Sequence, residues 1–246
     1  MAPAGPAAPA RRLGLMLPSS NTIVEPEAVR LMPPEGGVTV HFSRLGVTLI
    51  SDEQASLGQF APPAMLQAAR LLADAEVDLI AWAGTAASWL GFARDDTLVA
   101  AIERDFGIPA TTALLAINRR LAELGARSIG LVTPYVAALE QQIRANYAAI
   151  GIRTEAAERL DLTVNTDYAR VSPERIAALC RRVAVARPDA IVIMCTNLRG
   201  APVAGDLAAE LGIPVLDSVA VTVAHCLCRL GVAGQPGQPG RRLPAT

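Results

Sequence analysis

The chain has 246 residues, of which 52% are hydrophobic, so it can bury a sizeable core in one large domain or two small ones. Its formal net charge is −1 and its arginines are scattered, and we therefore expect no nucleic acid and no membrane as partner. All 22 basic residues are arginine, which excludes a pyridoxal Schiff base, a P-loop and a lysine general base. With two histidines, His41 and His225, we expect no metal site, and we predict that the protein uses no cofactor.

Both ends of the chain are low in complexity. Residues 1–11 are rich in Ala and Pro, and residues 233–246 are rich in Gly, Gln and Pro, so we expect two disordered tails. The first tail lacks the apolar core of a signal peptide, and no apolar run reaches the roughly 18 residues of a membrane span. We therefore expect a cytoplasmic protein whose four cysteines are free thiols.

Between these tails, short apolar runs alternate with helical patterns. Strands are expected at residues 12–18, 38–42, 77–83, 128–133, 153–160, 190–194 and 215–218. Helices are expected after Thr22, at 63–75, 96–105, 112–124 and 138–150, after Ser172, before Gly212 and at 219–230. Residues 47–58 resemble a surface loop. This alternation predicts an α/β fold with parallel sheets.

Three segments of the first half recur, in the same order, in the second half. Residues 12–18 match 128–134 at a Gly-Leu pair and a closing Pro, and residues 78–85 match 189–196 at the Asp, the apolar run and the Thr. Gly107-Ile-Pro matches Gly212-Ile-Pro. We therefore predict two similar parallel-sheet α/β halves related by a pseudo-two-fold, with the active site between them. The predicted division is 12–116 plus 215–232 for the first half and 117–214 for the second.

Cys195 is the leading catalytic candidate. It follows a fully apolar strand, and in open α/β sheets ligands bind beyond the carboxyl ends of the strands. A buried free cysteine is by default a small hydrophobe, and Cys180, Cys226 and Cys228 keep that interpretation. For Cys195, the strand-end position and the matching Gly84-Thr85 of the other half favour a catalytic thiol.

Other polar residues follow the same predicted strand ends. Hydroxyl groups there can cap helices or hold an anion, and both roles are compatible. The candidate ligand contacts are Pro18, Ser19, Asn21, Gly84, Thr85, Ser88, Tyr135, Asn165, Thr196 and Asn197. We expect Trp82 and Trp89 to pack in the core, with an apolar pocket wall as the alternative for Trp89.

These residues carry a resemblance over most of the chain. The segments Pro18–Thr22, Gly84–Thr85, Thr133–Tyr135, Asn165 and Cys195–Asn197 resemble, in order, the aspartate/glutamate racemase superfamily, and within it the maleate isomerase and arylmalonate decarboxylase group. Racemases and maleate isomerases of this superfamily have one cysteine per half. Gly84 stands at the first of these positions, and glycine first with cysteine second is the arrangement of arylmalonate decarboxylase.

The resemblance implies that Thr85 and Tyr135 hold a substrate carboxylate. Two positions depart from the decarboxylase pattern, because Ala86 replaces an expected serine and Thr196-Asn197 replaces two glycines. Asn21, Asn165 and the Thr196-Asn197 pair resemble the isomerase pattern instead. The sequence thus combines features of both groups.

The first functional hypothesis is a cofactor-independent decarboxylase of arylmalonate-type disubstituted malonates, in which Cys195 protonates one face of an enediolate. The second is a maleate cis-trans isomerase, or an Asp/Glu-type racemase, acting on small dicarboxylates. The third is a carboxylate-binding protein without catalysis. All three take a small dicarboxylate as partner, and the sequence leaves the oligomeric state open, a homo-oligomer included.

Overall fold

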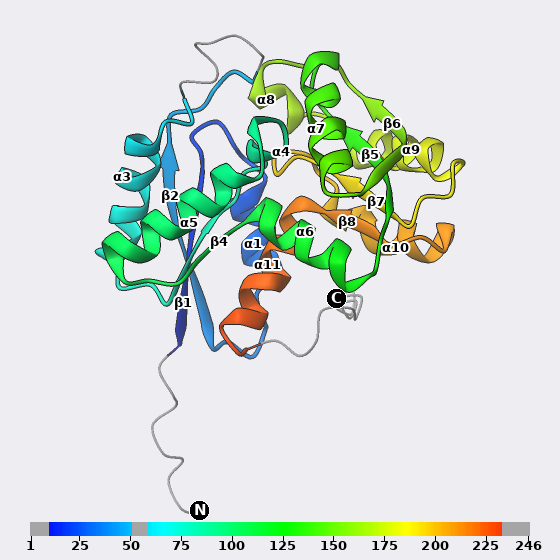
Figure 1. Cartoon of the computed structure of the whole chain (residues 1–246). Helices are drawn as coiled ribbons and strands as arrows, with labels where there is room; N and C mark the ends of the chain where they lie inside the picture. The colour runs from blue at the N-terminus through cyan, green and yellow to red at the C-terminus, as the bar shows by residue number, and fades with distance from the viewer. Residues whose placement is uncertain (1–9, 51–58, 233–246) are drawn as a thin grey trace, which may run out of the picture.

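The computed structural model describes residues 10–50 and 59–232 and consists of two lobes (Figure 1). Each lobe is built on a four-stranded parallel sheet with helices packed against it. This confirms the predicted α/β fold with two similar parallel-sheet halves. The predicted tails lie outside the described residues except for Ala10 and Arg11, and Arg11 already belongs to the first strand.

The two sheets have the same strand order. The first sheet has the order β2-β1-β3-β4, with strands β1 (Arg11–Pro18), β2 (Val38–Leu45), β3 (Leu79–Trp82) and β4 (Ala110–Thr112). The second has the order β6-β5-β7-β8, with strands β5 (Ser128–Thr133), β6 (Arg153–Arg159), β7 (Ala190–Ile193) and β8 (Val215–Asp217). The central strands β3 and β7 are buried on both faces, as their unbroken apolar runs predict.

The register of the two sheets shows which residues of the two halves are equivalent. Trp82 of β3 lies between Met16 of β1 and Thr112 of β4. Ile193 of β7 lies in the same way between Val132 of β5 and Asp217 of β8. Trp82 and Ile193 are therefore equivalent positions, and so are the residues two places further on, Gly84 and Cys195.

Helices cover both faces of each sheet. Those in the first part of the chain are α1 (Val24–Arg30), α3 (Pro62–Ala73), α4 (Ala87–Leu90), α5 (Ala93–Phe106) and α6 (Ala113–Glu123). The later ones are α7 (Ala137–Ala149), α8 (Asn165–Tyr168), α9 (Pro173–Ala184), α10 (Ala201–Leu211) and α11 (Ser218–Arg229). Some helix boundaries lie where the sequence predicts them. Ser172 caps the start of α9, and Gly212, whose φ is in the left-handed region, ends α10.

The last strand and the last helix belong to different lobes. Strand β8 pairs with β7, which corrects the predicted assignment of residues 215–217 to the first half. Helix α11 instead returns to the first sheet, where Val219 and Val223 join an apolar cluster with Leu15 and Leu79. It also packs beside α6, and the two helices lie between the lobes in Figure 1.

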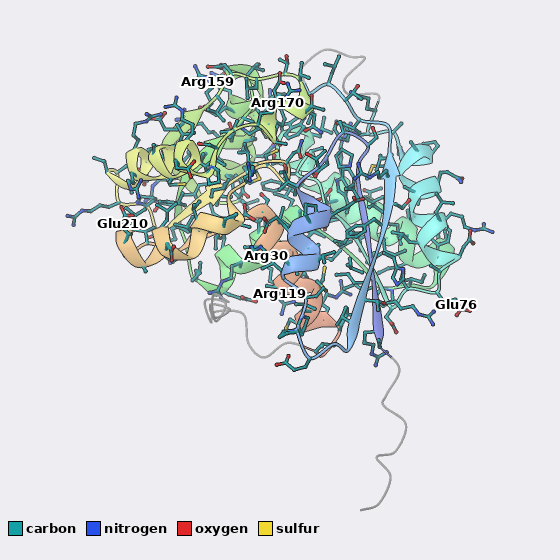
Figure 2. All side chains as sticks on the ribbon, turned by 180° about the vertical axis from the view of Figure 1, so that it is seen from behind. Arg30, Glu76, Arg119, Arg159, Arg170 and Glu210 are labelled. Carbon is teal, nitrogen blue, oxygen red and sulfur yellow. The ribbon has the colours of Figure 1, made fainter. Side chains whose placement is uncertain are left out.

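Most charged side chains lie on the outside of both lobes (Figure 2). Most are paired locally, as in the exposed ion pairs Arg30–Glu27 and Arg181–Glu210. Such pairs contribute roughly 0–1 kcal/mol each, so the fold depends mainly on its apolar core. None of the helices within residues 10–50 and 59–232 is long and apolar enough to cross a membrane.

Candidate active site

The candidate site is a small cavity between the lobes, at the carboxyl ends of the central strands. Its volume is about 20 Å³, room for about one water molecule. Residues that follow β1, β3, β5 and β7 contribute to its wall, as expected for parallel sheets. The lining residues are Pro18, Asn21, Ile50, Phe60, Trp82, Gly84, Thr85, Ala86, Trp89, Tyr135, Asn165, Cys195, Thr196 and Asn197.

Cys195 lies two residues beyond β7 and is 3% exposed. Its backbone N–H donates to Ser218 Oγ (3.2 Å), and that hydroxyl donates to the carbonyl of Ile193 (2.6 Å). The thiol sulfur accepts from the backbone N–H of Asn197 (3.3 Å). Burial raises the pKa of Cys195 to about 11, against the smaller opposite effect of this hydrogen bond. The thiol is therefore protonated at neutral pH.

Thr85 and Tyr135 form a pair of neutral hydroxyl groups in the same cavity. Thr85 Oγ1 and Tyr135 OH lie 3.0 Å apart and are hydrogen-bonded across the two lobes. Burial raises the pKa of Tyr135 well above 10, so its phenol keeps its proton. The backbone N–H groups of Thr85 and Ala86 have no hydrogen-bond partner among the described residues. Hydroxyls and free amides of this kind are suitable donors to a carboxylate.

Asn21 links the end of β1 to the loop after β7. Its Nδ2 donates to Thr196 Oγ1 (3.3 Å), and Thr196 Oγ1 donates to the carbonyl of Ala83 (2.9 Å). Its Oδ1 accepts from the N–H groups of Ile23 and Val24, so the same side chain also holds the start of α1. This bonding fixes the orientation of the amide.

Asn197 and Asn165 form a second link between the lobes. Asn197 Oδ1 accepts from the backbone N–H of Thr22 (3.1 Å), and its Nδ2 donates to the carbonyl of Asn165 (2.6 Å). Asn165 Nδ2 in turn donates to Ser20 Oγ (2.7 Å). These asparagines are buried and neutral, so the lining of the cavity carries no formal charge apart from what Cys195 or Tyr135 could acquire on ionisation.

Aromatic side chains make up the rest of the wall. Trp89 packs edge-on against Tyr135, with ring centroids 4.6 Å apart, and against Phe60. Its Nε1 is buried and has no hydrogen-bond partner within the described part of the chain. Trp82 also borders the cavity, although the sequence indicated only a core residue. Trp89 thus fits the alternative of a pocket wall.

The structure brings together eight of the ten expected contact residues and Cys195. The two that do not line the cavity are Ser19 and Ser88. Ser19 is exposed, and its Oγ accepts from the backbone N–H of Val47 (3.3 Å). Ser88 is fully buried in the short helix α4, because the chain turns immediately after Thr85 and carries the side chain away from the cavity.

The sequence analysis did not assign four of the lining residues to the wall, namely Ile50, Phe60, Trp82 and Ala86. Ile50 lies in the predicted surface loop at residues 47–58, where Val47 and Ile50 are in fact buried in the core. The backbone N–H of Ile50 donates to the carbonyl of Thr163 in the other lobe (2.9 Å). Residues 51–58 of that predicted loop lie outside the described residues. No cluster of three metal-ligating side chains occurs in the described ranges.

This fold, with a buried cysteine between two similar lobes, defines the class of protein. A family model described as arylmalonate decarboxylase matches residues 13–242, and the chain belongs to that family. Several relatives of the chain are named maleate isomerase. The isomerase of Geobacillus stearothermophilus is 26% identical over 235 residues, covering 90% of this chain and 92% of the relative. The arylmalonate decarboxylase of Bordetella bronchiseptica is 26% identical over 232 residues, covering 93% of each chain.

Solved structures of both kinds of enzyme are similar to this one. A maleate cis-trans isomerase variant from Nocardia farcinica, with a covalently bound succinylcysteine intermediate, is similar with a TM-score of 0.82 at 25% identity, covering 91% of this chain and 94% of that one. A liganded arylmalonate decarboxylase, in which a glycine is changed to cysteine and a cysteine to serine, has a TM-score of 0.82 at 23% identity. It covers 94% of this chain and 97% of that one.

Proposed function

We propose that this protein is a cofactor-independent decarboxylase of disubstituted malonates of the arylmalonate type. The observation that carries the proposal is a single protonated thiol in a neutral cavity, opposite a glycine at the equivalent position of the other half. A decarboxylase needs one acid on one face of the reacting carbon. Two-base racemisation, or addition of a thiolate from the first half, needs a group that Gly84 does not supply.

In the proposed reaction, Thr85, Tyr135 and nearby backbone N–H groups hold one carboxylate of the substrate. The other carboxylate lies against the aromatic wall, where loss of hydration disfavours its charge. The bond to that carboxylate breaks, carbon dioxide leaves, and the electron pair is delocalised into an enediolate that the same donors stabilise. Cys195 then transfers its S–H proton to the α-carbon, and the thiolate is reprotonated from water.

Maleate cis-trans isomerisation is the second candidate. Several relatives carry that name, and the buried Asn21, Asn165 and Asn197 follow the isomerase-like pattern of the sequence. An isomerase with a covalent cysteine intermediate would have to form it on Cys195, whose raised pKa keeps the thiolate scarce at neutral pH. This chemistry favours the decarboxylase.

The two candidates are separated by one pair of assays. The protein is incubated with a series of arylmalonates while carbon dioxide release is followed, and in parallel with maleate while fumarate formation is followed. The proposal expects carbon dioxide release and no fumarate. Fumarate formation without any carbon dioxide would establish the isomerase, and ligand-induced stabilisation without turnover would indicate a binding protein.

Cys195→Ser is expected to reduce the rate of carbon dioxide release by about 10²-fold or more, because a serine hydroxyl is a much weaker acid than a thiol. Cys228→Ser is the matched control, since Cys228 is the exposed cysteine of α11 and is remote from the cavity lining. Equal activity of both variants would remove Cys195 from the reaction.

A further inference from the structure

The two halves differ at two neighbouring pairs of equivalent positions beside the cavity. In the second half, Ile193 stands two residues before Cys195, and in the first half Trp82 stands two residues before Gly84. The sheet register makes these pairs equivalent. The aliphatic Ile193 therefore precedes a cysteine. The large indole of Trp82 precedes a glycine, which has no side chain.

The indole of Trp82 fills the space that a side chain at Gly84 would need. A Cβ atom built on Gly84 would lie 2.3 Å from Cζ2, 2.4 Å from Cε2 and 2.9 Å from Nε1 of Trp82. Carbon atoms in van der Waals contact lie about 3.5–4.0 Å apart, so the indole and any Cβ at Gly84 exclude each other.

The indole has little freedom to move aside. Trp82 is 2% exposed and packs in the main apolar core together with Met16 and Ile80. A rigid bicyclic ring in a close-packed core cannot yield by more than a few tenths of an ångström without displacing its neighbours. The packing of Trp82 therefore excludes a cysteine side chain at position 84, in addition to the glycine that stands there.

From this geometry we propose that Trp82 is the specificity-determining residue that limits the site to one acid. Its indole occupies the space that a first-half cysteine side chain at position 84 would need, and it borders the same cavity as Cys195. The substrate's α-carbon then meets a proton donor on one face only. This inference rests on the proposed function for its chemistry, but its packing argument stands independently.

The packing argument is tested by a double-mutant cycle on thermal stability. Gly84→Ala is expected to lower the melting temperature by roughly 3–10 °C, the cost of overpacking a rigid core. In a Trp82→Ile background, which reproduces the second half, the same Gly84→Ala change is expected to cost about 1 °C or less. Trp82→Phe provides a second background with a smaller ring if Trp82→Ile fails to fold. Gly205→Ala is the control, because a Cβ there meets no atom within 4 Å.

The chemical consequence is tested with the enantiomer of the product formed from methyl(phenyl)malonate. Gly84→Cys alone is expected to be destabilised and to give no loss of enantiomeric purity. Trp82→Ile/Gly84→Cys is expected to give a nearly racemic product, because the introduced thiol can donate from the second face. A single enantiomer from this double variant would overturn the role of Trp82.

Two further outcomes are distinguishable. If Gly84→Ala costs the same in both backgrounds, or as little as Gly205→Ala, the indole does not hold the space and the present inference is overturned. If the cycle shows the expected coupling but the wild-type protein releases no carbon dioxide from any arylmalonate, the packing role of Trp82 stands and the proposed decarboxylase function is overturned.

Discussion

At the scale of single residues, the chemistry of Cys195 follows from its burial. A thiol in water has a pKa of about 8.5 and is partly ionised just above neutrality. In this site burial raises the pKa to about 11, so the thiol remains an acid over the whole neutral range. A nucleophilic cysteine needs the opposite shift, and the direction found here is the one that proton donation requires.

The pH profile of the reaction should reflect this shift. The active form is protonated, so activity is present below the pKa of Cys195 and is lost as the pH rises through it. We expect kcat/KM for decarboxylation to show no loss from this group between about pH 7 and pH 9.5, with its alkaline loss near pH 11. Initial rates across this range check the prediction, and a midpoint near the ordinary value of about 8.5 would contradict it.

The sequence alone predicted the residues of this site better than their roles. Cys195, Gly84 and Thr85 could be predicted because strand ends and the internal repeat mark them. The wall function of Trp82 could not be predicted, because it depends on where the ring goes after the backbone turns. Ser88 was expected beside Thr85, but one turn of helix α4 directs it into the core.

At the scale of elements, two buried carboxyl groups lie at the starts of the helices that follow the equivalent strands β4 and β8. Asp217 caps α11, where its Oδ1 accepts from the N–H groups of Val219 and Ala220 (both 2.9 Å). Asp95 accepts a short hydrogen bond from Thr112 Oγ1, the cap of α6. Burial raises the pKa of each aspartate to about 7. Both caps thus involve a carboxyl group that the folded protein prefers to keep protonated.

These groups should make the fold less stable as the pH rises. Between about pH 4 and pH 7 the unfolded chain has ionised both carboxyls while the folded chain still binds the protons, so unfolding releases protons. The free energy of unfolding is then expected to fall by at most about 1.4 kcal/mol per pH unit for each group, and to level off above about pH 7. Carboxylates such as Asp78 and Glu210, whose pKa is lowered by hydrogen bonds from Arg12 and Arg181, contribute to the pH dependence with the opposite sign.

Asp217→Asn tests whether Asp217, the cap of α11, causes part of this pH dependence of the free energy of unfolding. The amide oxygen can still accept from the start of α11 but cannot ionise, so the variant should lose part of the pH dependence and keep the helix. Urea unfolding at several pH values between about 5 and 8 measures the slope, with Asp95→Asn as the parallel variant. A slope equal to that of the wild type would mean that Asp217 does not titrate in this window.

The elements themselves were predictable to different degrees. Helix α7 was expected within one residue of both its ends, and α9 was expected to begin after Ser172, as it does. The four-residue helices α4 and α8 were missed because they have no complete period, and the strand β4 was missed because its last residue was assigned to the helix expected at 112–124. Asn165 was expected in a polar loop and instead begins α8.

At the scale of the whole molecule, the lobes are held together around a cavity too small for a dicarboxylate. The links include Asn21–Thr196, Thr85–Tyr135 and an isolated antiparallel bridge between Leu49 and Val164. A cavity of about 20 Å³ has room for about one water molecule, so substrate must enter a more open arrangement. We therefore expect the two lobes to separate when substrate enters, and we refer to the arrangement described here as the closed form.

A disulfide across the bridge should trap this closed form. Residues paired across antiparallel strands have Cβ atoms about 4.5–5.5 Å apart, close to the separation that a disulfide requires. In the variant Leu49→Cys/Val164→Cys, oxidation is expected to lower kcat/KM at least about tenfold and reduction to restore it. The two single variants are the controls. Unchanged activity of the fully oxidised double variant would show that substrate can enter while the bridge between residues 49 and 164 stays closed.

The central claim is that one thiol protonates one face of an enediolate, and the most direct test is the decarboxylation of methyl(phenyl)malonate in heavy water. The account predicts one equivalent of carbon dioxide and a product with a single deuterium at the α-carbon in one enantiomer, with both signals lost in Cys195→Ser. A racemic deuterated product from the wild-type protein would contradict it.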